Sequence, residues 1–211
     1  MKERNYKIKE IYYTLQGEGF HTGQAAIFCR FSGCNLWTGR EEDRAKAICQ
    51  FCDTDFWGMD GLNGGKYSAS ELTARILEIW PLDTQPFIVF TGGEPALQLD
   101  EALITELKKH GSYIAIETNG TLELATGIDW ICVSPKANTD IVVKEGHEIK
   151  IVYPQAGIDP LDFKDWDFQF KYIQPMDSEL SEENTKAAIK FCKEHPEYKL
   201  SIQTHKYLDI P

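Results

Sequence analysis

Short apolar runs alternate along the chain with segments of helical pattern. The first run, residues 6–13, alternates polar and apolar side chains, as a half-buried strand does. A later run, residues 87–90, is wholly apolar, which is typical of a buried strand. The runs interpreted as strands are residues 6–13, 26–31, 87–90, 113–116, 130–133, 149–152, 168–173 and 199–203.

Three segments carry helix signals at their ends. Ser68 and Glu71 form a capping-box pattern that opens the first helix. The second helix ends at Gly111, a residue that favours the turn after a helix, and the third stops before Pro196. The helices are expected over residues 68–80, 100–110 and 181–195.

Strands that alternate with helices predict a parallel α/β sheet built from βαβ units. A complete eightfold barrel needs ~250 residues, or roughly 31 per unit. The 211 residues of this chain fall short of seven such units. We therefore expect one domain over residues 1–211, folded as an open, about six-stranded partial TIM-type barrel with parallel strands.

Five of the predicted strands are followed at once by a polar or glycine-rich cluster. In parallel α/β folds, binding and catalytic groups gather at the carboxyl ends of the strands. We therefore expect these clusters to meet at one site. They are Ser32-Gly33-Cys34-Asn35, Thr91-Gly92-Gly93-Glu94-Pro95, Glu117-Thr118-Asn119-Gly120, Ser134-Pro135-Lys136 and Gln174-Pro175-Met176-Asp177.

The composition narrows the class of protein. Hydrophobic residues make up 42% of the chain, as in a folded globular protein. The formal net charge of −11 predicts repulsion of phosphate backbones, so we expect no nucleic-acid partner. No stretch is long and apolar enough to cross a membrane, and residues 1–6 lack the apolar core of a signal peptide. A cytoplasmic location is expected.

Three cysteines carry the most informative chemistry. Cys49 and Cys52 form a CxxC pair, and Cys34 lies fifteen positions before its first member. Three thiolates on a cubane iron–sulfur cluster leave one iron open to chelate a substrate. A structural zinc site is the alternative, but it needs a fourth ligand, for which His21 and Cys29 are the candidates. The remaining cysteines are interpreted as core residues: Cys29, Cys132 and Cys192.

A glycine-rich turn follows the buried strand over residues 87–90. Gly92 and Gly93 would let a ligand approach the backbone closely, and the neighbouring Glu94 carboxylate could hold an ammonium group. A tight turn before a helix explains the same residues. The motif indicates a ligand site only in combination with the cysteines.

Three cysteines after one strand and Gly-Gly-Glu-Pro after the next resemble the radical S-adenosylmethionine superfamily. Most members space the cysteines as CxxxCxxC, whereas fourteen residues separate Cys34 from Cys49 here. The wide gap and four further motifs resemble the 7-carboxy-7-deazaguanine synthase family over about residues 14–177. These motifs are Leu15-Gln16-Gly17-Glu18-Gly19, Arg30, Cys52-Asp53-Thr54 and Ser134-Pro135-Lys136.

The resemblance implies a reaction and its requirements. Members of this family convert 6-carboxy-5,6,7,8-tetrahydropterin to 7-carboxy-7-deazaguanine with release of ammonia, a step towards queuosine and related 7-deazapurines. A [4Fe-4S] cluster, S-adenosylmethionine and Mg²⁺ are implied as cofactors. An electron donor such as a flavodoxin and a homodimeric assembly are implied as well.

The resemblance also implies roles for individual residues. The cluster ligands would be Cys34, Cys49 and Cys52, and the Mg²⁺ ligand would be Thr54. The substrate would bind to Gln16, Gly17, Glu18, Arg30, Thr91 and Gly92. S-adenosylmethionine would bind to Phe51, Asp53, Gly93, Glu94, Glu117, Asn119, Ser134, Pro135, Lys136, Gln174, Pro175, Met176 and Asp177.

The chemistry of these side chains suits their implied roles, but each also has a simpler explanation. Glu18 can accept hydrogen bonds from the donor edge of a pterin, and the fork of Arg30 can bind its carboxylate. For Glu18 the simpler explanation is a charge in a solvated turn, and for Arg30 it is an ion pair on the face of a strand. Thr54 and Asn119 lie in sequences typical of ordinary turns, and Met176 suits plain packing.

The end of the chain gives one further expectation. If the strand over residues 199–203 runs parallel to the others, the eight residues after it begin at the end of the barrel where the polar clusters are expected to meet. Their apolar side chains favour a packed tail, with His205 near the substrate and the Pro211 carboxylate at the donor edge of the pterin. A tail folded against the outer wall is the alternative.

Two other functions remain open from the sequence. A glycyl-radical activating enzyme would share the cluster chemistry but would need a groove for a partner protein. A small zinc-binding interaction module, which belongs to a different class, would use the cysteines without S-adenosylmethionine.

Overall fold

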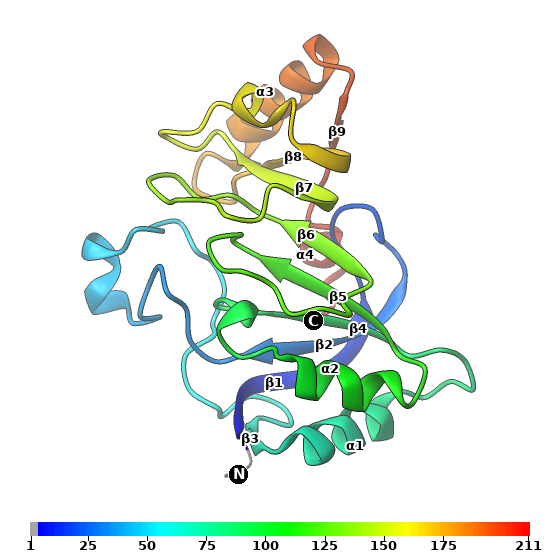
Figure 1. Ribbon diagram of the computed structural model, residues 1–211. Helices are drawn as coiled ribbons and strands as arrows, with labels where there is room; N and C mark the ends of the chain where they lie inside the picture. The colour runs from blue at the N-terminus through cyan, green and yellow to red at the C-terminus, as the bar shows by residue number, and fades with distance from the viewer. Residues whose placement is uncertain (1–3) are drawn as a thin grey trace.

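Nine strands form one open sheet within residues 4–211, the part of the chain that the computed structural model describes (Figure 1). Residues 1–3, which belong to the segment without a signal-peptide core, lie outside this range. The strand order is β3-β1-β2-β4-β5-β6-β7-β8-β9. The strands are β1 (Tyr6–Leu15), β2 (Ala25–Phe31), β3 (Gly65–Tyr67), β4 (Phe87–Gly92), β5 (Tyr113–Thr118), β6 (Trp130–Val133), β7 (Glu145–Tyr153), β8 (Asp167–Pro175) and β9 (Tyr198–Leu200).

Most of the sheet is parallel, which confirms the expected α/β class. Within the described chain, β2 and β4 to β9 are parallel neighbours, whereas β1 pairs antiparallel with both β2 and β3. The expected count of six strands is wrong, and so is a parallel β1. Only a short loop, residues 16–24, joins β1 to β2, and a parallel crossover needs a dozen or more residues.

The helices begin and end close to their sequence signals. The Ser68 hydroxyl accepts from the Glu71 amide at 3.3 Å, and the Glu71 carboxylate accepts from the Ser68 amide at 2.8 Å, which confirms the capping box. No helix within residues 4–211 is long and apolar enough to cross a membrane. The helices are α1 (Ala69–Ile79), α2 (Glu101–Lys108), α3 (Ser181–Glu194), α4 (Thr204–Leu208), and the 3₁₀ helices η1 (Glu41–Lys46), η2 (Pro95–Leu97) and η3 (Pro160–Phe163).

The larger helices cover one face of the sheet and leave the other face for a site. Leu72 of α1 and Leu103 of α2 pack with Ile27 and Phe90 in a cluster that also contains Cys29, as expected for a core cysteine. Helix α3 covers the β7–β8 end in a second cluster, against which Cys192 packs. Because side chains alternate along a strand, every second residue of these strands points to the opposite face.

The last expected strand is only partly correct. Strand β9 ends at Leu200, and residues 204–208 form helix α4 instead of continuing the sheet. The Thr204 amide and hydroxyl both donate to the Gly17 carbonyl, at 2.9 and 2.8 Å, so the chain leaves the sheet for the loop after β1. The C-terminus then lies among the strands β2, β4 and β5 in projection (Figure 1). Thr14 Oγ1, in β1, donates to the backbone oxygen of Pro211 at 2.9 Å.

Candidate active site

A cavity of about 420 Å³ opens at the carboxyl ends of the parallel strands, a size that suits small-molecule ligands. All five polar clusters that were expected to meet contribute to its wall. Cys34 follows β2, Thr91 lies in β4, Glu117 in β5, Gln174 in β8, and Ser134 follows β6. Motifs far apart in the sequence therefore converge on one site, as the strand pattern predicted.

Two residues of the predicted site do not line the cavity: Glu94 and Pro135. Glu94 is fully buried, and its carboxylate accepts from the Ala96 amide at 2.9 Å, the Thr118 hydroxyl at 2.7 Å and the Asn119 amide at 2.7 Å. Burial raises the pKa of Glu94. Glu94 thus fixes the loop after β5, and its contact with an ammonium group stays a prediction.

The three candidate cluster cysteines share one wall of the cavity, and none of them forms a disulfide. The Leu36 amide lies 3.4 Å from Cys34 Sγ, and burial raises the pKa of Cys34 and of Cys49. Arg44 donates to the Gln50 and Cys52 carbonyls at 2.9 and 3.0 Å, so it holds the CxxC loop in place. These contacts suit a cluster-binding loop.

The donor set also fits a cubane cluster. Within residues 4–211, no three His, Cys, Asp or Glu side chains gather closely enough to hold a single metal ion. A cubane does not require such a group, because each thiolate binds a different iron atom. Three free thiols spread along a cavity wall are therefore compatible with a [4Fe-4S] cluster.

The glycine pair at the end of β4 packs directly on the segment from Phe31 to Cys34. A Cβ on Gly93 would lie 2.2 Å from the Gly33 carbonyl oxygen and 2.7 Å from the Cβ of Cys34. Gly92 has a φ of +134°, which disfavours other residues, and a Cβ there would lie 2.3 Å from the Phe31 carbonyl oxygen. The glycines thus let two loops of the cavity wall touch through their backbones.

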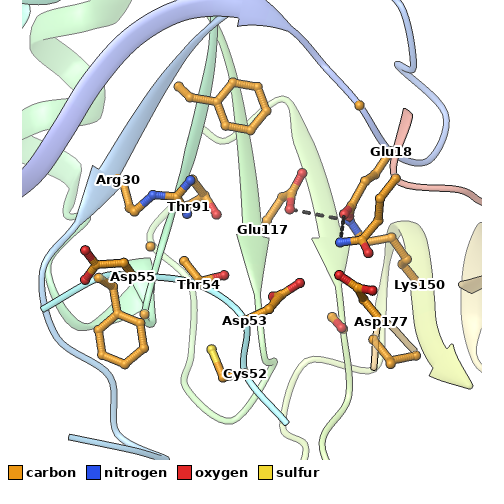
Figure 2. Close-up of a pocket in the computed structure, with 18 of the residues that line it drawn as sticks. Glu18, Arg30, Cys52, Asp53, Thr54, Asp55, Thr91, Glu117, Lys150 and Asp177 are labelled. Atoms are coloured by element: carbon orange, nitrogen blue, oxygen red, sulfur yellow. Dashed lines mark hydrogen bonds and ion pairs between the residues drawn. The ribbon is translucent and has the colours of Figure 1, made fainter. Parts of the chain in front are cut away.

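A network of charged groups forms another part of the cavity wall (Figure 2). Lys150 bridges the carboxylates of Glu18 and Glu117. Gln16 donates to Glu117 at 2.8 Å, and Gln203 donates to Glu18 at 3.0 Å. Burial alone would raise the pKa of Glu18, but the charge of Lys150 and the hydrogen bonds from Lys150 and Gln203 together outweigh burial and lower that pKa to about 2. Glu18 is therefore a charged acceptor and not a solvated turn residue.

Arg30 combines both of its proposed interpretations. Its Nε donates to Glu10 at 2.8 Å and its Nη2 to the Tyr12 hydroxyl at 2.9 Å, as a strand-face ion pair would. Its side chain also lines the cavity beside Thr91, with Thr54 nearby (Figure 2). The ion pair presents the guanidinium to the cavity in a fixed position.

Two lysines hold the remaining polar groups of the wall. Lys206, in α4, lies 2.7 Å from Asp53 and also pairs with Asp177, so it joins the cysteine loop to the end of β8. Asp53 and Asp177 lie on the same side of the cavity (Figure 2). Lys136 donates to the Ser134 hydroxyl at 2.6 Å, and burial lowers the pKa of Lys136.

The C-terminal tail lies inside the site. His205 and Pro211 both line the cavity, so the alternative of a tail on the outer wall is wrong. A Cβ on Gly17 would lie 2.2 Å from His205 Nδ1, which shows how closely the tail packs on this loop. Contact of His205 and Pro211 with a substrate stays a prediction.

Known proteins are similar to this chain over almost its whole length, although no protein-family model matches it. A 7-carboxy-7-deazaguanine synthase from Burkholderia multivorans is 56% identical over 208 residues, which cover 98% of this chain and 99% of the relative. A second, from Caulobacter vibrioides, is 54% identical over 210 residues, with the same coverage. The chain belongs to the 7-carboxy-7-deazaguanine synthase family. The family resemblance of the motifs is thereby confirmed.

A solved structure agrees with the family. The crystal structure of QueE from Escherichia coli matches with a TM-score of 0.73 at 28% identity and covers 94% of each chain. The relatives favour a synthase over the activating enzyme and the zinc-binding module.

Several cavity residues carry no recognisable family motif and were missed in the sequence. Lys150 lies between two isoleucines in β7, and this alternation was the available signal that it faces away from the helices. Cys132 is buried as expected of a core residue, but it also lines the cavity. The other missed residues include Lys9, Tyr12, Asp55, Gln203 and Lys206.

Proposed function

We propose that this chain converts 6-carboxy-5,6,7,8-tetrahydropterin to 7-carboxy-7-deazaguanine with release of ammonia, in the cavity described above. One observation carries the proposal: the three candidate cluster cysteines, the loop with Glu18 and the C-terminal tail all line the same cavity. The family membership gives the reaction, and the cavity brings the cofactor side and the substrate side together.

The protein mainly positions the reactants and excludes water. When bound, the [4Fe-4S] cluster and S-adenosylmethionine supply an electron and the carbon radical that takes a hydrogen atom from C6 of the tetrahydropterin. Cys34, Cys49 and Cys52 hold the cluster on one wall. The polar network around Lys150 holds the substrate on another part of the wall.

The substrate side uses charged and hydroxyl groups. The Glu18 carboxylate accepts hydrogen bonds from the donor edge of the pterin, and the guanidinium of Arg30 binds the substrate carboxylate. The Thr54 hydroxyl would be an oxygen ligand of Mg²⁺, and the charge of this ion would help to hold the substrate carboxylate. Thr91, Gly92, His205 and Pro211 close the pocket around the ring.

The cofactor side uses the ends of β5, β6 and β8. Ser134 and Lys136 would bind the methionine carboxylate, and Glu117 and Asn119 would contact the ribose. The segment from Gln174 to Asp177 would contact the adenosine, and Phe51 and Asp53 would contribute from the cysteine loop. All of these residues line the cavity, which supports their grouping into one cofactor site.

The proposal extends to the domain, the assembly and the location. Residues 1–211 act as one radical S-adenosylmethionine domain, in which the parallel strands β2 and β4 to β9 form an open, partial TIM-type barrel. The protein acts in the cytoplasm as a homodimer and receives electrons from a donor such as a flavodoxin. Family membership supports these statements, and the continuous sheet supports the single domain.

Anaerobic reconstitution followed by turnover tests the proposed function. The protein is loaded with iron and sulfide and then incubated with the carboxypterin, S-adenosylmethionine, Mg²⁺ and dithionite. A brown, oxygen-sensitive protein that forms 7-carboxy-7-deazaguanine, detected by mass spectrometry, is the expected result. A colourless protein that binds zinc would support the interaction module, and a brown protein that leaves the pterin unchanged would contradict the synthase.

Replacing Thr54 with valine should lower turnover about tenfold at limiting Mg²⁺, because valine keeps the shape of threonine but offers no oxygen ligand. The absorption spectrum of the cluster should stay unchanged. A Mg²⁺ titration of both proteins measures the effect. Thr38→Val, which changes a threonine between Cys34 and Cys49 that lies outside the cavity lining, is the matched control. If Thr54→Val shows the wild-type Mg²⁺ dependence, Thr54 is only a turn residue.

A further inference from the structure

Lys150 is a buried cation shared by two carboxylates. Its side chain is 6% exposed and lies on the cavity wall between Glu18 and Glu117 (Figure 2). The ammonium nitrogen contacts Glu18 Oε2 and lies 3.4 Å from Glu117 Oε2. One ammonium group therefore joins β7, β5 and the loop after β1.

The second oxygen of each carboxylate is held by a glutamine amide. Gln203 Nε2 donates to Glu18 Oε1 at 3.0 Å, and Gln16 Nε2 donates to Glu117 Oε1 at 2.8 Å. Both oxygens of each carboxylate thus accept a hydrogen bond or an ion pair from another side chain. Two carboxylates at close range in a buried wall repel each other, so this arrangement depends on the charge of Lys150.

The other charged groups near Lys150 do not replace it. Glu148 lies two residues earlier on the same face of β7, and its carboxylate accepts from the Phe20 amide at 3.0 Å. This further carboxylate makes the surroundings more negative. His205, from the tail, lies near Glu18, and Lys136 lies near enough to Lys150 to interact with it electrostatically, but Lys136 donates to Ser134 and not to either carboxylate. Lys150 is the cation that contacts both Glu18 and Glu117.

We infer that Lys150 is a positioning residue that makes the substrate site specific for rings with an amino and N–H donor edge. The inference rests on the proposed function, in which Glu18 accepts hydrogen bonds from that edge. By fixing the charged Glu18 carboxylate, Lys150 keeps this part of the cavity wall a hydrogen-bond acceptor. The site therefore takes a 2-amino-4-oxo pteridine and rejects its 2,4-dioxo counterpart, whose carbonyl would face a carboxylate with no hydrogen between them.

Binding of two stable fluorescent rings to the full-length protein tests the inference without turnover. The rings are 6-carboxypterin and 6-carboxylumazine, which carries a carbonyl in place of the 2-amino group. The wild type should bind the pterin at least about tenfold more tightly. Lys150→Met should lose most of this preference, and Lys150→Arg should retain it because arginine keeps the charge.

A matched control and a charge-balanced variant separate positioning from folding. Lys190→Met removes a lysine that is 76% exposed on α3 and should bind both rings as the wild type does. The double variant Lys150→Met/Glu117→Gln leaves the net charge of the wall unchanged, and circular dichroism checks its fold. It should still lack the preference. A double variant with wild-type preference would show that Lys150 only neutralises charge, and the inference would be wrong.

Turnover distinguishes a failure of this inference from a failure of the proposed function. A wild type that prefers the pterin but does not convert the carboxytetrahydropterin refutes the reaction and leaves the role of Lys150 intact. A wild type that converts the substrate, but whose Lys150→Met variant keeps the preference for the pterin, refutes the role of Lys150 alone. Equal binding of the two rings by the wild type also refutes that role.

Discussion

Replacing Cys49 with alanine should abolish cleavage of S-adenosylmethionine, and Cys34→Ala and Cys52→Ala should have the same effect. The reason is that three thiolates bind three irons of a cubane, so the site has no spare ligand. All three cysteines line the cavity, and the carbonyl of Cys52 is held by Arg44. The measurement is the yield of 5′-deoxyadenosine and methionine after reconstitution and reduction with dithionite.

The other cysteines are the matched controls for this result. Cys192 lies in α3 and packs against the second core cluster, Cys29 lies in the first, and neither lines the cavity. Cys192→Ala and Cys29→Ala should therefore keep cleavage close to the wild-type level. A Cys49→Ala protein that cleaves S-adenosylmethionine fully with an intact cluster would overturn the ligand assignment.

Removing residues 209–211 should raise the Michaelis constant for the carboxypterin by roughly 10- to 100-fold. The deletion removes the Pro211 carboxylate from the cavity together with its contact to Thr14, which is 2.9 Å long. Hydrogen bonds to charged groups contribute about 1.5–3 kcal/mol, which corresponds to that range. Steady-state kinetics at saturating S-adenosylmethionine gives the value.

A second measurement and a control confine this effect to the substrate. Cleavage of S-adenosylmethionine without the pterin should persist in the shortened chain, because the cysteine wall does not include residues 209–211. Tyr207→Ser changes a side chain of the same tail that is 76% exposed and should leave the Michaelis constant unchanged. Wild-type kinetics in the shortened chain would mean that the terminus lines the cavity without binding the substrate.

Local signals predicted those parts of the fold that depend on neighbouring residues. The Ser68 cap, the end of α2 near Gly111 and the apolar run of β4 follow from such signals, and the structure confirms them. The antiparallel pairing of β1 depends on which strand lies beside it, and the three-residue β3 is too short to give a pattern. The pattern of apolar residues along a segment shows that it forms a strand, but it does not show which distant strand pairs with it.

In the site, too, residues in distinctive motifs were found from the sequence, whereas residues whose role depends on their surroundings were not. The cysteines and the glycine pair were found because their types and spacing are distinctive. Lys150 was missed because an isolated lysine in an apolar strand has no motif, and its direction depends on which face the helices cover. Glu94 shows the converse, since its motif indicated a ligand contact whereas its carboxylate accepts from the protein's own backbone.

The central claim is that one cavity holds the pterin and S-adenosylmethionine so closely that a hydrogen atom passes directly between them. Substrate deuterated at C6 tests this most directly. After anaerobic turnover, mass spectrometry should find the deuterium in 5′-deoxyadenosine or in the adenosyl group of recovered S-adenosylmethionine, together with 7-carboxy-7-deazaguanine. Cleavage of S-adenosylmethionine with all of the deuterium still at C6 of unconverted substrate would contradict the account.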